Sequence, residues 1–239
     1  MGIIPTHPRA CFLAAEANRI LRYLEDAEHY YRLALQSWSS HSPSWTGLGA
    51  TLFDQLAFVE SQTCTDRAIR VDPKNPSALY LRALLRERRG DEFGATRDYG
   101  RAHRLAPELF PRHSTLSSDE ILAMLDQAVE YSDHSVRTFI QEVSVHIMGI
   151  PSASMCADYE PPAPPAEIVG YFSSVPLSDD GTGSSPGGCP GTIVLFQKNL
   201  ERMAGDPTRL LTALQSTIVK EIEEYLGMDH QPAAVSLFE

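Results

Sequence analysis

The sequence predicts an all-helical repeat unit followed by a smaller α+β unit. A pattern with a period of 34 residues runs through residues 8–109, and the balance of charge changes sharply near residue 112. After residue 117, helical spacing of apolar residues gives way in places to the alternation typical of strands. The chain has 239 residues, of which 43% are hydrophobic, so it is long enough to build two cores.

The repeat is clearest in residues 42–75 and 76–109, which align without gaps. Small, large and proline residues coincide: Trp45 with Leu79, Gly49 with Ala83, Ala68 with Ala102, Val71 with Leu105, and Pro73 with Pro107. A weaker copy covers residues 8–41, with Ala15, Ala27, Tyr31 and Ala34 in register. Each copy predicts two helices joined by a short turn such as Arg89-Gly90-Asp91, with proline after the second helix. One copy cannot bury its apolar face alone, so three are expected to stack.

On these landmarks, residues 8–109 resemble the tetratricopeptide repeat (TPR) family, with repeats at 8–41, 42–75 and 76–109. The resemblance implies a TPR-like array that binds a protein or peptide partner on its inner face. The candidate partner-binding residues occupy matching positions on the first helix of each repeat: Phe12, Glu16, Arg19, Thr46, Phe53, Tyr80, Glu87 and Arg88. Arg19 and Arg88 suit an acidic peptide or a C-terminal carboxylate. The alternatives are a plain solvated surface and docking of the second unit on this face.

The second unit is predicted over residues 117–239 and begins with a helix. Ser117 or Ser118 can cap its free amides, and two acidic residues follow in its first turn. Residues 136–148 read as a helix that continues into a strand, because apolar residues alternate from Val143. Residues 158–167 are rich in proline and predict a stiff connector.

Two more strands are expected at 168–177 and 192–200, with a glycine-rich loop at 178–191 between them. One long helix then runs to Gly227, capped by Asp206 and with Pro207 in its first turn. The predicted order is therefore helix, three strands and helix, which is an α+β unit.

The stretch IVKEIEEYLGMD, residues 218–229, has the outline of the zinc-peptidase pattern H-E-x-x-H followed by glycine. With the preceding segments IVGYFSSVPLSDDG and PGTIVLFQKNL, residues 117–230 resemble the small bacterial zincin-like predicted metallopeptidases. In that family two histidines four residues apart bind zinc, and the glutamate between them takes a proton from the metal-bound water. Here Lys220 and Glu224 stand in place of the histidines, Glu221 keeps the position of the general base, and the third ligand position falls on His230.

Three interpretations of this stretch remain open. The first is a degenerate zincin-like domain without a catalytic metal or other cofactor, because an ammonium group does not bind a metal ion at neutral pH. The second is a rebuilt site in which Glu224 and His230, with Asp229 as a further candidate ligand, hold one divalent metal ion; this oxygen-rich set suits Mn, Mg or Ca better than Zn. The third is an ordinary acidic surface helix, in which Glu223 and Glu224 pair with Lys220.

Charge and composition limit the class of partner. Residues 1–112 contain 15 basic and 13 acidic residues, whereas residues 113–239 contain 5 and 18, so the second half would repel nucleic acid. No stretch is long and apolar enough for a membrane helix, and no secretory signal is predicted at the start of the chain. Four scattered cysteines without a C-x-x-C pair favour reduced, mostly buried thiols and a cytoplasmic location.

The leading functional hypothesis is a non-catalytic adaptor, in which the TPR-like array binds a protein or peptide and the zincin-like domain is a pseudoenzyme. The alternative is a divergent metal-dependent peptidase that uses Glu221, Glu224 and His230. A third possibility is a chaperone or secretion adaptor whose acidic half masks a basic partner.

Overall fold

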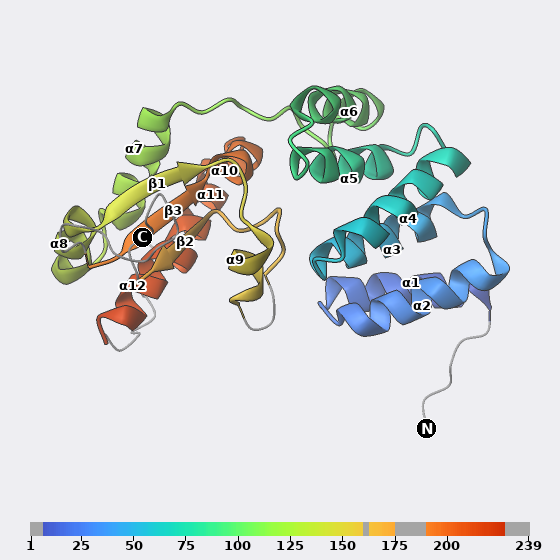
Figure 1. Ribbon diagram of the computed structural model, residues 1–239, viewed down its shortest axis with the longest axis horizontal. Helices are drawn as coiled ribbons and strands as arrows, with labels where there is room; N and C mark the ends of the chain where they lie inside the picture. Colours follow the sequence, from blue (N-terminus) through green and yellow to red (C-terminus); the bar gives the residue numbers. More distant parts are fainter. Residues whose placement is uncertain (1–6, 160–162, 175–189, 228–239) are drawn as a thin grey trace, which may run out of the picture. The chain divides into compact units, whose positions relative to one another are not determined.

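The computed structural model describes residues 7–159, 163–174 and 190–227 (Figure 1). The chain divides into two compact units. The first contains Met1–Arg112 together with Ser152–Glu167, and the second contains His113–Pro151 and Ile168–Glu239. Ser152–Glu167 therefore belongs in space to the helical unit, although in sequence it lies inside the second unit.

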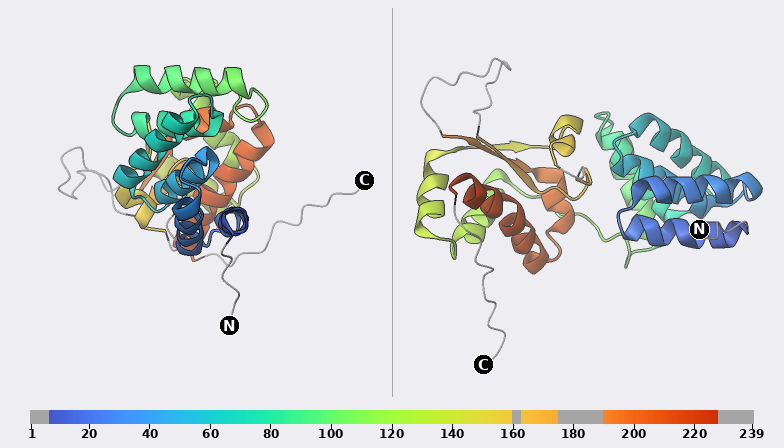
Figure 2. Two further views of the ribbon diagram at one scale, coloured as in Figure 1. Left: turned by 90° about the vertical axis from the view of Figure 1, so that its right-hand side faces the viewer. Right: turned by 90° about the horizontal axis from the view of Figure 1, so that it is seen from below.

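Among the described residues, six helices of the first unit pack as three antiparallel pairs (Figures 1 and 2). They are α1 (Pro8–Ile20), α2 (Leu24–Ser37), α3 (Ser42–Asp54), α4 (Phe58–Val71), α5 (Pro76–Glu87) and α6 (Glu92–Leu105). Corresponding helices begin 34 residues apart throughout. The same spacing recurs in the backbone, because Arg22, Leu56 and Gly90 all adopt left-handed conformations, with φ of 64°, 64° and 75°. The predicted TPR-like array is thus confirmed.

Small residues at repeated positions bring the helices of each pair together. Ala34, Ala68 and Ala102 are fully buried in α2, α4 and α6. A buried polar network also links the second repeat to the third. The Asn75 side chain caps α5 and donates hydrogen bonds to Ser42 Oγ and Thr46 Oγ1, at 2.8 and 3.0 Å. Since each of these buried groups has a partner, the network fixes the stacking of the repeats without an unpaired polar group.

The second unit combines a three-stranded sheet with helices. Its elements are α7 (Ser118–Val129), α8 (His134–Glu142), β1 (Ser144–Met148), β2 (Gly170–Ser173), β3 (Thr192–Phe196), α10 (Gln197–Met203), α11 (Pro207–Leu214), the π-helical turn η1 (Gln215–Val219) and α12 (Lys220–Tyr225). The strand order is β1-β3-β2, with β1 parallel and β2 antiparallel to the central β3. The predicted fold class, a helical array followed by an α+β unit, is confirmed.

The core of this unit lies between one face of the sheet and the helices. Ile193 and Leu195 of β3 pack with Ile121 of α7, Leu214 of α11 and Ile218 of η1, all with no more than 2% exposure. Gly170 in β2 allows this close packing, because a Cβ there would lie 2.6 Å from Ile218 Cδ1. The final helices are therefore held tightly against the edge of the sheet.

The predicted helix ends of the second unit are confirmed. Ser117 caps α7 in a reciprocal capping box with Glu120. The Asp206 side chain accepts from the Arg209 amide at the start of α11, and Gly227 ends the last helix with φ of 68°.

Several expectations for the second unit were wrong. Residues 192–200 do not form one strand: β3 ends at Phe196 and α10 follows, since Leu200 and Met203 continue with helical rather than alternating spacing. The predicted last helix runs as expected from Pro207 to Tyr225 through α11, η1 and α12, and η1 is a π-helical turn within it. A short helix, α9 (Ala153–Ala157), stands where no element was predicted, and most of the predicted 178–191 loop lies outside the described residues.

Candidate functional site

Helix α12 carries the stretch that resembles the zinc-peptidase pattern. Lys220 Nζ lies 3.7 Å from Glu224 Oε1, one helical turn away, and both side chains are more than half exposed. The two positions that the resemblance led us to expect as histidine positions therefore form an ordinary surface ion pair, which contributes about 0.3–0.5 kcal/mol.

Glu221, between these two residues, points to the sheet. Its Oε2 accepts a hydrogen bond from the backbone N–H of Phe172 in β2, at 2.9 Å. Because β2 lies at one edge of the sheet and this N–H does not bond to β3, it is one of the groups that an edge strand leaves unpaired. The carboxylate thus satisfies the backbone of the edge strand.

The π-helical turn η1 sets the direction of α12. A π turn inserts an extra residue into the helix and rotates the next turns by about 100° relative to a continuous α-helix. η1 ends at Val219, directly before Lys220, and its Ile218 packs over Gly170 of β2. This arrangement brings Glu221 within bonding distance of the strand.

An aromatic cluster adjoins Glu221. The rings of Phe139 (α8), Phe172 (β2) and Tyr225 (α12) lie with centroids 5.4–5.9 Å apart, and Tyr225 is 48% exposed. No sequence pattern indicates this cluster, because its members come from three separate segments. Their tilted and edge-to-face contacts each add about 0.5–1.5 kcal/mol and fix α12 against β2.

The described side chains around α12 do not fit a catalytic zinc ion. Zinc requires at least three nitrogen, sulfur or carboxylate ligands, and Lys220 offers a paired ammonium in place of the first. Glu221 is bonded to backbone, and within 7–159, 163–174 and 190–227 no three His, Cys, Asp or Glu side chains gather in a way that could hold a metal ion. His230, the predicted third ligand, lies outside the described residues.

The predicted partner-binding residues of the first repeat lie together on α1. The Phe12 ring meets His41 edge-on, with centroids 5.0 Å apart. Arg19 forms an ion pair of 3.4 Å with Glu16, and Glu16 also accepts a hydrogen bond from the Tyr31 hydroxyl. Burial and this bond raise the pKa of Tyr31, so the phenol stays protonated.

The predicted residues of the second and third repeats differ in exposure. Thr46 is buried in the Asn75 network, and Phe53 is 4% exposed. Tyr80 is partly buried against Tyr99, with ring centroids 5.1 Å apart.

Glu87 and Arg88 are partly exposed at the end of α5. The Arg88 guanidinium lies 4.1 Å from the centroid of the Phe58 ring, and burial lowers its pKa. This end of the array therefore combines an arginine with aromatic side chains, a composition suited to recognising peptides.

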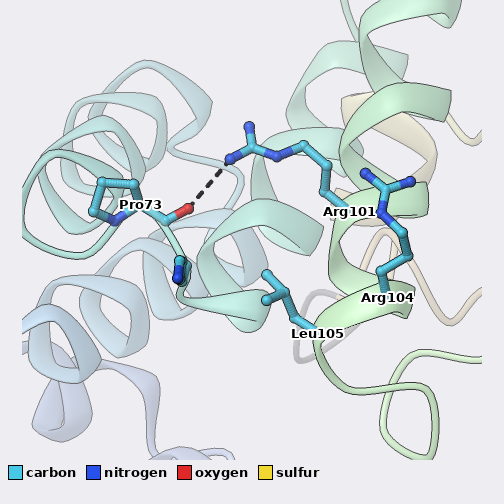
Figure 3. Close-up of a pocket in the computed structure, with 5 residues that line it drawn as sticks. Pro73, Arg101, Arg104 and Leu105 are labelled. Atoms are coloured by element: carbon cyan, nitrogen blue, oxygen red, sulfur yellow. Dashed lines mark hydrogen bonds between the residues drawn. The ribbon is translucent and has the colours of Figure 1, made fainter.

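A shallow cavity of about 170 Å³ lies where the second and third repeats join (Figure 3). It is lined by Pro73, Lys74, Arg101, Arg104 and Leu105. Arg101 Nη2 donates to the Pro73 carbonyl at 3.2 Å, so this arginine is partly used in holding the turn. This basic site was not predicted from the sequence, although its three cations lie within a few residues of the closing prolines of the 34-residue pattern.

Together the two units define a TPR-like helical array combined with a zincin-like α+β unit. The chain belongs to the family of zincin-like metallopeptidases, whose family model matches residues 103–234. Among solved structures, the TPR domain of Arabidopsis OM64 is similar, with 19% identity and a TM-score of 0.40 over 42% of this chain and 84% of that one. No curated protein matches the chain. None of the described helices is long and apolar enough to cross a membrane.

Proposed function

We propose that this protein is a non-catalytic adaptor. The helical array binds a protein or peptide partner, and the zincin-like unit is a pseudopeptidase that keeps the fold of its family without the chemistry. The observation that carries the proposal is the Lys220–Glu224 ion pair in place of two zinc ligands, beside a Glu221 that is bonded to the Phe172 amide.

The chemistry of zinc-dependent hydrolysis supports the proposal that this protein does not cleave peptides. A glutamate in the position of Glu221 can act as a general base only if the water it faces is acidified by a metal ion. Zinc lowers the pKa of bound water from about 15.7 to about 7, and no residue among those described supplies an equivalent effect.

The free thiols support a reducing compartment, so we also place the protein in the cytoplasm. Cys11, Cys64 and Cys156 are buried and form no disulfide with one another. Burial raises the pKa of Cys64 to about 11, which keeps this thiol protonated and unreactive.

Metal content and peptide hydrolysis of the purified full chain test the pseudopeptidase. After dialysis against Zn, Mn, Mg and Ca, the wild type should retain less than about a tenth of an equivalent of any metal and cleave no peptide in a mixed substrate library. The double variant Lys220→His/Glu224→His should gain zinc affinity, whereas the matched control Lys220→Gln/Glu224→Gln should not. Near-stoichiometric metal in the wild type, with hydrolysis that disappears in Glu221→Gln, would overturn the proposal.

Binding to an array of defined peptides tests the adaptor role. Tyr80→Ala, on the first helix of the third repeat, should weaken binding at least about tenfold. Phe93→Ala removes a ring of similar size that is 81% exposed on α6, and it should leave binding unchanged. Equal effects of both variants would argue against partner binding on the predicted face.

A further inference from the structure

The segment Ser152–Glu167 is placed unusually for a connection between two strands. It follows β1 and precedes β2 of the second unit, yet it clusters with the helical unit. Its described parts are α9 and the turn at residues 163–167, which are tied together by a hydrogen bond from the Ala163 amide to the Cys156 carbonyl, at 3.0 Å. A connector between β1 and β2 would need no such contacts with another unit.

One end of the segment packs on the predicted partner-binding face. Ala166 packs against an apolar cluster of the second and third repeats. Its buried members lie on the first helices, α3 and α5, and are Phe53, Leu81, Leu84 and Leu85; Phe58, Tyr80 and Tyr99 are partly buried around them. Pro165, directly before Ala166, is buried as well. Two predicted partner-binding residues, Phe53 and Tyr80, thus belong to the cluster that this segment contacts.

The other described part of the segment reaches the same end of the array. Cys156 is fully buried, and it lies close enough to Arg88 for the arginine to oppose the rise in the thiol pKa that burial causes. Near the second repeat, burial raises the pKa of Asp54, and the neighbouring Glu167 adds to this shift while Arg22 opposes it. Both α9 and residues 163–167 therefore meet the array at α3 and α5.

We propose that Ser152–Glu167 is an internal ligand of the helical array, and that an external partner of this face presents a short segment of the same chemistry, rich in proline and alanine. The proposal deepens the adaptor function and rests on it for the external partner. Because the internal segment is tethered, its effective concentration is of millimolar order, and a partner must compete with it. The internal segment then occupies part of the binding face of the array until a stronger ligand displaces it.

A fluorescently labelled synthetic peptide of residues 152–167 tests this directly with the full-length protein. Ala166→Asp places a charge in the apolar contact and should release the internal segment while leaving the array unchanged. The labelled peptide should then bind this variant at least about tenfold more tightly than the wild type, as measured by anisotropy. Ala153→Asp, at an exposed position of the same segment, is the matched control and should behave as the wild type.

Alkylation of Cys156, followed by mass spectrometry, provides a second measurement. Its rate should rise at least about tenfold in Ala166→Asp and stay unchanged in Ala153→Asp, because only release of the segment exposes this thiol. Equal peptide affinity and equal alkylation in all three proteins would overturn the internal ligand. If the labelled peptide binds Ala166→Asp but no peptide of the defined array binds any form, the internal ligand stands and the adaptor function fails.

Discussion

The hydrogen bond between Glu221 and Phe172 gives the sharpest test of what the glutamate does. In Glu221→Ala the Phe172 N–H loses a charged acceptor at 2.9 Å and remains partly buried at the edge of the sheet. Hydrogen bonds to charged groups contribute about 1.5–3 kcal/mol, so the free energy of opening at this amide should fall by that amount. Since about 1.4 kcal/mol corresponds to a factor of ten, its protection from hydrogen exchange should fall roughly 10- to 100-fold.

Glu221→Gln separates a structural role from a catalytic one. The glutamine oxygen can still accept from Phe172, although a neutral bond is worth about 0.5–1.5 kcal/mol, so protection should fall only about tenfold or less. Glu224→Ala, which removes only the surface pair with Lys220, is the control and should change protection by no more than about twofold. Hydrogen exchange of fragments that cover residues 170–173 gives the measurement. If Glu221→Ala leaves protection unchanged, or if Glu221→Gln lowers it as much as alanine does, the structural role is refuted.

Three further predictions concern stability. Asp98→Asn should destabilise the first unit by about 3–5 kcal/mol, because it removes the buried negative charge that pairs with two arginines at 2.6 and 2.9 Å. Denaturant unfolding followed by tryptophan fluorescence reports this unit alone, and a loss of stability under about 1 kcal/mol would contradict the prediction. Gly47→Ala should cost about 1–3 kcal/mol in the same assay, since the added methyl would overlap the Tyr31 ring, and an unchanged midpoint would show that the ring moves aside. Burial and nearby basic side chains lower the pKa of His113 from 6.5 to about 4, so protonation of this histidine favours the unfolded state. The second unit should therefore lose stability as pH falls from about 6.5 to about 4. Hydrogen exchange should show that this part of the pH dependence disappears in His113→Gln.

The helical array could be predicted from the sequence because its information is local and repeated. Alanine or glycine at fixed positions, every 34 residues, specifies where helices touch, and the proline after the second helix marks its end. The helix caps at Ser117 and Asp206 and the stop at Gly227 were predictable for the same reason, since each depends on residues only a few positions apart.

The features that could not be predicted depend on contacts between distant segments. The strand β3 and the helix α10 share one apolar run, and only the tertiary contact of Gln197 and Glu201 with Leu116 shows where one becomes the other. The π turn before Lys220 leaves no pattern of its own. The aromatic cluster beside Glu221 and the packing of Ala166 on the array each join segments far apart in the chain, which no periodicity can express.

The structure also distinguishes Glu221 from the two residues that flank it in the same stretch, Lys220 and Glu224. Lys220 and Glu224 face solvent and pair with each other, so replacing either should cost the fold almost nothing. Glu221 faces the edge strand and accepts its N–H, so its loss would leave a partly buried backbone group unpaired. The fold of this unit therefore depends on Glu221 but hardly on the surface pair, whether or not the stretch is catalytic. Under the proposed non-catalytic function, Glu221→Ala should therefore reduce the stability of the second unit without any change in hydrolysis.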